Sequence, residues 1–324
     1  MINGLLKLSA AAVMLIVGLT AAQAQAPAGP HRPAAVPADF VITPFGYFHP
    51  TCVVHLAQRD ELRPDQGIIR HTNGAIASMP HCSYPHYRGD GEKVERDERA
   101  VKTPNISHSW VVSESVVTGG AYGTITGQWN VPPTPPSNDG QTLFYFTGLE
   151  DANNVVTILQ PVLGWNSDYA SAWGIASWNC CENGTTYEAT PQHANPGDTI
   201  LGYILQNCNA GTTKTCTSFD VVTQDLQSGN YSALTNTSNF TQTFNWAFGG
   251  VLEVYNIAKC SDYPNNPNGF TGGTHTINFD ALGLYNWKGQ LVAAPAWTLN
   301  LWATGLTPQC NYNGSTPSSV TIDY

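Results

Sequence analysis

Short runs of alternating apolar and polar residues fill the chain beyond residue 104. The runs are rich in β-branched and aromatic residues and are separated by Gly, Pro, Asn and Asp, which is typical of β-strands. The pattern predicts strands at 123–131, 142–147, 155–163, 199–205, 218–226, 250–257, 275–279, 297–302 and 319–324. No stretch carries a helical stripe, and no repeat is present. We therefore expect an all-β fold, an antiparallel β-sandwich of two packed sheets.

Charge divides the chain into two parts. Ten of its 13 Lys and Arg residues precede Pro104, and so do six of its nine histidines. Just before this boundary, Arg88 to Lys102 (RGDGEKVERDERAVK) has the mixed charge of an exposed, protease-accessible linker. We interpret residues 27–103 as a propeptide and residues 104–324 as the sandwich domain. The alternative for 27–103 is a small accessory domain that stays attached.

The first 26 residues read as a signal peptide. A short segment with one lysine is followed by an apolar run and by Ala-Gln-Ala sequences that suit signal peptidase. This is typical of a bacterial exported protein, so we expect a secreted protein. No later run is apolar enough to span a bilayer, and we expect no membrane association after signal cleavage.

Composition indicates which partners the protein can bind and whether its cysteines form disulfides. A net charge of −10 with only 13 Lys and Arg argues against nucleic acid as a partner. The eight cysteines of an exported chain favour disulfides over a cysteine nucleophile. We expect Cys52 to pair with Cys82 and Cys208 with Cys216, whereas Cys180, Cys181, Cys260 and Cys310 can pair in three ways.

The familiar catalytic motifs are absent. The sequence has no His-Glu-x-x-His, no phosphate-binding glycine loop and no Gly-x-Ser-x-Gly. His108, His193 and His275, the histidines beyond residue 104, have no metal-ligand spacing. We therefore expect no metal, no cofactor and no Ser-His triad, which leaves carboxylates and amides as candidates.

Two polar residues occupy strand positions where the pattern is apolar. Gln160 shares a strand face with Ile158 and Val162, and Glu253 shares one with Val251 and Tyr255. Apolar surroundings disfavour an ionised carboxylate, so we expect the pKa of Glu253 to be raised. The alternative is that these faces meet solvent or that both side chains are satisfied by hydrogen bonds.

Several motifs in a fixed order resemble the glutamic peptidases called eqolisins. The family's motifs are matched by Gly127-Gln128-Trp129-Asn130-Val131-Pro132, Phe146-Thr147-Gly148-Leu149-Glu150, Ile158-Leu159-Gln160, Ala172-Trp173, Asn195-Pro196-Gly197-Asp198-Thr199-Ile200 and Leu252-Glu253-Val254. The resemblance covers residues from about 120 to 282. It implies a concanavalin-like β-sandwich and a secreted endopeptidase that acts in acid on protein or peptide substrates. We expect a monomer.

The resemblance assigns a role to four residues. Glu253 matches the general base and acid, and Gln160 matches the amide that stabilises the oxyanion, so that a water held between them attacks the peptide bond. Trp129 and Trp173 match substrate-binding tryptophans. Two carboxylates of the family pattern are missing here. Gly164 stands at the first of these positions, at the end of Gln160-Pro161-Val162-Leu163-Gly164, and Ile175 stands at the second, at the end of Trp173-Gly174-Ile175.

Two other functions stay open. The related neprosins pair two glutamates and cut after proline, but Gln128 stands near the expected first glutamate. A carbohydrate-binding sandwich is the alternative from another class, with Trp129, Trp165 and Trp173 as sugar platforms.

Acid conditions should affect the two parts of the chain differently. The sandwich domain has three Lys and no Arg, so it gains little positive charge and should tolerate low pH. The six N-terminal imidazoles gain charge as the pH falls through about 6.5. We predict that acid loosens the propeptide and permits autocleavage within Arg88 to Lys102.

Overall fold

The computed structural model of the protein describes residues 32–95, 109–153, 157–181, 184–208, 216–265, 275–302, 308, 310–315 and 319–324. The signal-peptide residues, residues 96–102 of the linker and His108 lie outside these ranges. Regular structure in the described residues is almost entirely β-strand, with short 3₁₀ turns such as Pro50–Cys52 and Cys260–Asp262. Within this part of the chain, no helix is long and apolar enough to cross a membrane.

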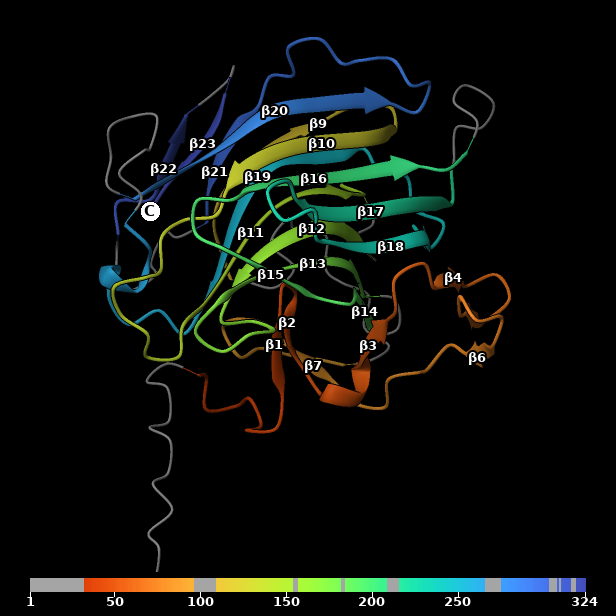
Figure 1. The fold of residues 1–324 in the computed structure, drawn as a ribbon, viewed down its shortest axis with the longest axis horizontal. Coiled ribbons are helices and arrows are strands. Elements are labelled where there is room, and N and C mark those ends of the chain that lie inside the picture. Colours follow the sequence, from red (N-terminus) through yellow and green to blue (C-terminus); the bar gives the residue numbers. More distant parts are fainter. Residues whose placement is uncertain are drawn as a thin grey trace, which may run out of the picture.

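Two large sheets form the body of the protein (Figure 1). The ten-stranded sheet has the order β22 (Asn313–Ser315), β23 (Val320–Asp323), β20 (Thr276–Asn286), β10 (Tyr122–Asn130), β16 (Thr199–Gln206), β17 (Ser218–Asp225), β18 (Tyr231–Ser238), β4 (Glu61–Arg63), β5 (Ile68–Arg70), β6 (Ile76–Ser78). The nine-stranded sheet has the order β21 (Thr298–Leu301), β9 (Trp110–Val117), β19 (Trp246–Tyr255), β11 (Thr142–Glu150), β12 (Ile158–Trp165), β13 (Trp173–Cys180), β14 (Thr186–Ala189), β3 (Val53–Leu56), and β15 (Gln192–Ala194) pairs with β13. Neighbouring strands are antiparallel except for β14 with β3 and β18 with β4.

A large apolar core lies between the two sheets. Alternation along each strand sends Trp129 of the ten-stranded sheet and Tyr145 and Trp173 of the nine-stranded sheet into this core. The rings of Tyr145 and Trp173 pack together with centroids 6.0 Å apart, and Trp129 packs on Phe279 of its own sheet at 5.3 Å. All nine segments predicted from the sequence contain strands, and the predicted β-sandwich is confirmed.

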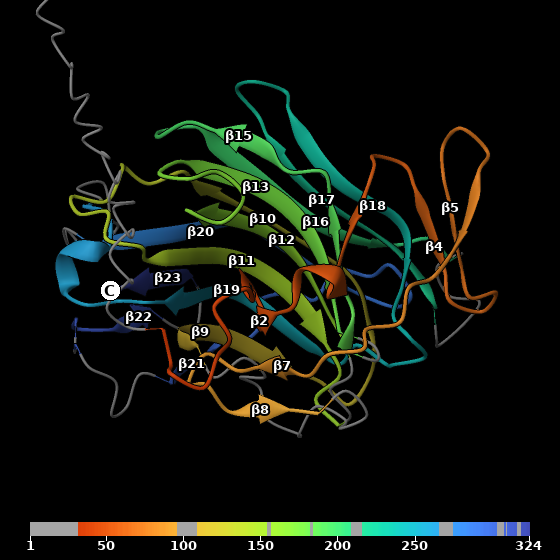
Figure 2. The same cartoon turned by 90° about the horizontal axis from the view of Figure 1, so that it is seen from below.

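The opposite face of the nine-stranded sheet is also buried. Every residue of β11, β12 and β13 is buried, although only alternate residues point into the core between the sheets. The other residues, among them Phe146, Trp178 and Tyr255, form a second apolar cluster with side chains from the N-terminal part of the chain. We call residues 32–95 the N-terminal cover. Figure 1 draws it in orange below the sandwich, and Figure 2 shows it from below, with β2 and β7 in front of strands of this sheet.

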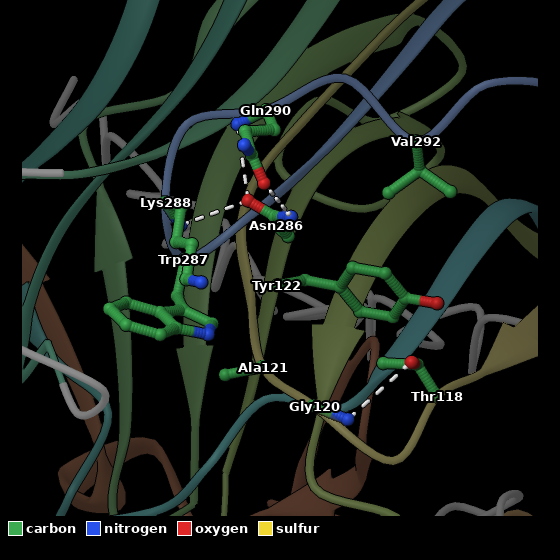
Figure 3. A pocket seen from close by; sticks show the side chains of 9 residues that line it. All are labelled: Thr118, Gly120, Ala121, Tyr122, Asn286, Trp287, Lys288, Gln290 and Val292. Carbon is green, nitrogen blue, oxygen red and sulfur yellow. Dashed lines mark hydrogen bonds between the residues drawn. The ribbon is translucent and has the colours of Figure 1, made fainter. Parts of the chain in front are cut away.

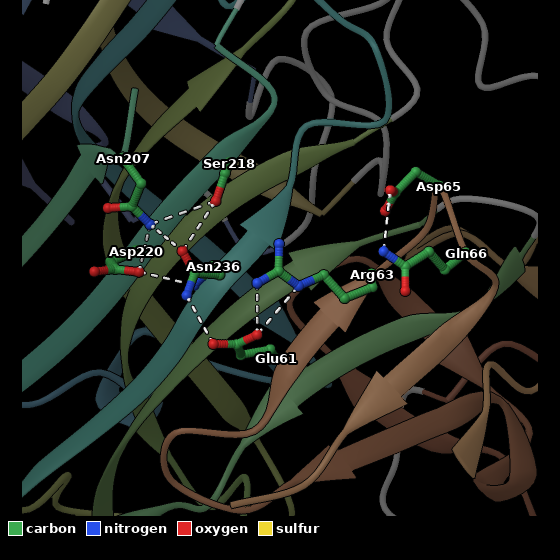
Figure 4. Close-up of polar contacts among 8 residues, drawn as sticks. All are labelled: Glu61, Arg63, Asp65, Gln66, Asn207, Ser218, Asp220 and Asn236. Atoms are coloured by element: carbon green, nitrogen blue, oxygen red, sulfur yellow. Dashed lines mark hydrogen bonds and ion pairs between the residues drawn. The ribbon is translucent and has the colours of Figure 1, made fainter. Parts of the chain in front are cut away.

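The N-terminal cover is connected to both sheets. Its own four-stranded sheet has the order β1 (Val41–Thr43), β2 (Gly46–Phe48), β7 (His86–Tyr87), β8 (Lys93–Val94). Strand β3 extends the nine-stranded sheet, and β4 to β6 extend the ten-stranded sheet. Where β4 joins the ten-stranded sheet beside β18, Asn236 of β18 donates a 3.2 Å hydrogen bond to Glu61 of β4 (Figure 4). Strands of the cover therefore continue both sheets of the sandwich.

The start of the predicted linker is folded. Arg88 is only 6% exposed and Val94 only 3%, because β8 pairs with β7 within the cover. Asp90, Glu92, Lys93 and Glu95 are exposed as predicted, whereas Arg88 and Val94 are not, and residues 96–102 lie outside the described part of the chain. The disulfides Cys52–Cys82 and Cys208–Cys216 are confirmed. The other four cysteines form Cys180–Cys181 and Cys260–Cys310.

Candidate active site

Gln160 lies in the middle of the covered face of the nine-stranded sheet. On one side, Gln160 pairs with Trp178 of β13. On the other side, the register between β11 and β12 places Gln160 opposite Gly148. The side chain is fully buried, and neither its amide oxygen nor its nitrogen has a hydrogen-bond partner among the described residues. An unpaired buried amide costs about 1–3 kcal/mol. A buried polar group without a partner calls for an explanation, and a catalytic or ligand-binding role is one such explanation.

Glu150 is the carboxyl group nearest to Gln160 in this register. It pairs with Ile158, two residues from Gln160 on the same face, so the two side chains are diagonal neighbours on adjacent strands. Such neighbours lie about 7–8 Å apart, within reach of a shared water for two long side chains. Glu150 is fully buried, and within the described ranges neither carboxylate oxygen has a partner. Burial, and then the charge of Asp151, raise its pKa well above the usual value.

Glu253 lies elsewhere on the same face. As the sequence predicts, it is buried beside Val251 and Tyr255. Its carboxylate accepts hydrogen bonds from the Ser109 hydroxyl at 2.7 Å, the Trp110 indole at 3.0 Å and the Tyr255 hydroxyl at 2.6 Å.

The structure does not bring Gln160 and Glu253 together. Glu253 pairs with Phe144, which in turn pairs with Gly164, four residues along β12 from Gln160. Four residues along a strand span about 13 Å, and two strand spacings add about 10 Å across the sheet. In the row of Gln160, the residue that β19 sets beside Gly148 is Phe248. In this register the carboxyl group nearest to Gln160 is therefore that of Glu150, not that of the predicted partner Glu253.

The two tryptophans assigned to substrate binding lie on the other face of the sheets. Trp129 and Trp173 belong to the core between the sheets, and each is only 1% exposed. Trp165, the third tryptophan of the carbohydrate-binding alternative, is equally buried beside Trp173. In this structure none of the three rings presents a face to the surface on which a sugar could stack. Gln128 alternates with Trp129 on β10 and therefore points away from this core, on the other sheet from Gln160.

A further buried carboxyl group belongs to Glu188, which the sequence reasoning missed. Glu188 lies on β14 and pairs with Trp178 of β13, which is itself the cross-strand neighbour of Gln160. Its carboxylate meets the imidazole of His55 from the N-terminal cover at 2.8 Å. Burial, and then Asp168, raise the pKa of Glu188 well above the usual value. His55 and Glu188 thus connect the cover to the edge of the candidate site.

An open hollow of about 290 Å³ lies away from this face, around the turn after β20 (Figure 3). Its walls include Thr118, Tyr122 and Trp287, and none of its lining residues is a carboxylate, histidine or cysteine. The side-chain oxygen of Asn286 is used within the turn, where it accepts from the backbone of Lys288 and Gln290. The hollow's only titratable lining groups are Tyr122 and Lys288, so it holds no carboxyl group for the predicted chemistry. Among the described residues, no group of three or more His, Cys, Asp or Glu side chains could hold a metal ion.

Comparison with known proteins finds similarity in structure alone. No protein family matches the sequence, and no curated protein matches it. The structure is similar to scytalido-glutamic peptidase bound to a peptide-based transition-state analogue, with 14% identity and a TM-score of 0.46 over 66% of this chain and 98% of that one. It is also similar to SCP-B, described as an eqolisin in complex with Ala-Ile-His, with 13% identity and a TM-score of 0.44 over the same shares of the two chains. A toad ovary galectin shares 10% identity, with a TM-score of 0.24 over 46% of this chain and 93% of its own.

Proposed function

We propose that this protein is a secreted endopeptidase that acts in acid and is made in a covered, inactive form. One observation carries the proposal: the amide of Gln160 and the carboxyl group of Glu150, neither of which has a hydrogen-bond partner among the residues that the structure describes, are diagonal neighbours, buried on a sheet face beneath the N-terminal cover. The order of eqolisin-like motifs in the sequence supports the same activity.

In this mechanism Glu150 takes the role that the sequence resemblance gives to Glu253. Ionised Glu150 removes a proton from a water held beside Gln160, and the water oxygen attacks the carbonyl carbon of the peptide bond. The NH₂ group of Gln160 donates to the developing oxyanion. Protonated Glu150 then passes its proton to the leaving amine as the carbon–nitrogen bond breaks, which regenerates the carboxylate.

Removal of the cover would change the ionisation of Glu150. Burial is the largest cause of the raised pKa of Glu150. Water that enters when the cover leaves reduces the cost of ionisation and lowers this pKa toward the usual value of a carboxyl group. Glu150 would then be partly ionised in mild acid, where a general base near its own pKa works best.

The amide of Gln160 gives the most direct test of the site. Wild-type protein and Gln160→Ala are incubated in acid, and cleavage of a denatured protein substrate is followed from pH 2 to 8. We expect wild-type activity in acid and a loss of about 100-fold or more in the variant, because one oxyanion donor is worth about that factor. Gln242→Ala, which changes a buried glutamine outside this face, is the matched control. Equal activity of Gln160→Ala and wild type would contradict the proposal.

A further inference from the structure

The tip of the β1–β2 hairpin carries an aromatic side chain where a turn is normally polar. Thr43 pairs with Gly46, so Pro44 and Phe45 form the two-residue turn. Hairpin turns usually lie at the surface, yet Phe45 is only 1% exposed. The Thr43 hydroxyl donates to the Gly46 carbonyl at 3.0 Å and holds this turn in shape.

Phe45 contacts the residue that stands beside Gln160. Its ring meets Trp178 edge to face, with centroids 6.0 Å apart and planes at 72°. Trp178 is 3% exposed and is the direct cross-strand neighbour of Gln160. The hairpin tip therefore fills a space next to the candidate catalytic amide.

The hairpin is fixed in this position by its surroundings. Gly46 has φ of +122°, and a Cβ there would lie 2.2 Å from the Tyr87 carbonyl oxygen of β7, so only glycine allows this close approach. Two positions beyond Phe45, Tyr47 meets Tyr255 edge to face at 5.3 Å and donates to Asn256 at 3.3 Å. Phe45 and Tyr47 thus attach the β1–β2 hairpin to the face at two points.

We propose that Trp178 forms a binding subsite for an aromatic side chain of the substrate peptide, and that Phe45 occupies this subsite in the covered protein. When the hairpin leaves, Trp178 presents an apolar aromatic surface beside Gln160, and an incoming aromatic ring restores the edge-to-face contact. The reading of this subsite as a substrate site rests on the proposed function. Trp178 then selects substrates with an aromatic residue beside the cleaved bond, whereas Gln160 and Glu150 carry out the reaction.

Binding of a small probe tests the subsite without any need for catalysis. In the full chain, Phe45→Ala leaves a space that N-acetyl-phenylalanine amide fills, and N-acetyl-alanine amide is the comparison ligand. We expect the phenylalanine probe to raise the melting temperature of Phe45→Ala saturably, by about 2–4 °C at ten times its dissociation constant. The alanine probe should have no such effect, and wild type should respond to neither probe because Phe45 fills the subsite.

Two further variants show where the probe binds. Phe40→Ala is the matched control, because Phe40 is a buried phenylalanine of the cover whose ring packs edge-on against His49 and Tyr87. Phe45→Ala combined with Trp178→Ala should lose the response. An equal response of Phe45→Ala to both probes, an equal response in Phe40→Ala, or none at all would overturn the proposal.

A second measurement covers the case in which Phe45→Ala does not fold. Acid-treated wild-type protein is titrated with a labelled synthetic peptide of residues 41–48 and with the same peptide carrying Phe45→Ala. We expect the first peptide to bind at least about tenfold more tightly, the factor typical of one good aromatic contact. Equal affinities would overturn the subsite. Proteolysis is measured on the same samples, so selective binding without cleavage would reject only the peptidase function, and cleavage without selectivity only the subsite.

Discussion

The indole nitrogen of Trp110 donates a 3.0 Å hydrogen bond to the carboxylate of Glu253, and the same ring packs edge-on against Phe248 with centroids 4.9 Å apart. With the hydroxyls of Ser109 and Tyr255, three donors converge on this buried carboxylate. Glu253 thereby connects β9 to β19 through side chains as well as through the backbone ladder. The contacts of this glutamate indicate a role in stability.

Glu253→Ala should therefore unfold much more easily than wild type. The substitution leaves three buried donors without their acceptor and opens a cavity, which costs about 3–5 kcal/mol. Urea unfolding followed by tryptophan fluorescence measures the difference. Glu253→Gln keeps one acceptor oxygen and should lose less. Wild-type stability of Glu253→Ala would show that the three hydrogen bonds contribute little.

Buried carboxyl groups should make the sandwich more stable in acid than at neutral pH. Burial raises the pKa of Glu114 to about 8, with a smaller rise from the charge of Asp323 and against backbone hydrogen bonds that lower it. Burial is also the largest cause of the raised pKa values of Glu150 and Glu188. A raised folded-state pKa favours the protonated group, so its contribution is fully present below about pH 4.5 and is lost as the pH rises toward 8. We expect the melting temperature to fall by about 5 °C or more between pH 4.5 and 8.

Glu114→Gln isolates one of these groups. The neutral amide needs no ionisation, so the variant should lose less stability than wild type between pH 4.5 and 8. Melting curves of both proteins at these two pH values supply the comparison. The assignment fails if the two proteins show the same pH dependence. The carboxylate of Glu114 lies against Gly314, where β22 covers β9, so an added amide group must fit in the same space.

The N-terminal cover should respond to acid in the opposite direction. His86 stacks on Phe48 with centroids 4.7 Å apart, and burial, followed by the Arg88 charge, lowers its pKa to about 4. The unfolded imidazole titrates near 6.5, so the contribution of neutral His86 is present above that pH and is lost as the pH falls toward 4. The loss reaches up to about 3 kcal/mol.

Hydrogen exchange of the backbone measures this loosening directly. Amides of β2 and β7 should exchange faster, relative to the intrinsic rate, at pH 4.5 than at pH 7, while those of β11 and β12 stay protected. His86→Phe keeps an aromatic ring on Phe48 and should abolish the difference. Equal protection of β2 at both pH values in wild type would reject His86 as the pH-sensitive group.

The strands with strong alternation were predictable from the sequence, and the polar ones were not. Strand β18 (Tyr231–Ser238) reads as a loop because of its Ser, Thr and Asn residues, yet Ser232 is buried and hydrogen-bonds Ser177 across the sandwich. Strand β9 (Trp110–Val117) was not predicted for a similar reason, because Glu114 interrupts its apolar residues. Buried polar residues that pair between sheets give no alternating signal.

The candidate site was predictable only in part. The alternation around Gln160 and Glu253 correctly predicted their faces and their burial, because strand periodicity determines both. Their separation depends on the register of three strands, which alternation does not encode. Glu150 ends a motif that the sequence comparison used, but its nearness to Gln160 follows only from the pairing of β11 with β12.

The most direct test of the central claim compares two carboxyl groups in one assay. Glu150→Gln and Glu253→Gln are prepared beside wild type, checked for folding, treated with acid and assayed on a denatured protein substrate from pH 2 to 8. The account predicts that Glu150→Gln folds but loses about 1,000-fold or more of the activity, as expected for removal of a general base. It also predicts that Glu253→Gln, where folded, retains activity within about tenfold. Full activity of Glu150→Gln, or loss confined to folded Glu253→Gln, would contradict the account and return the catalytic role to Glu253.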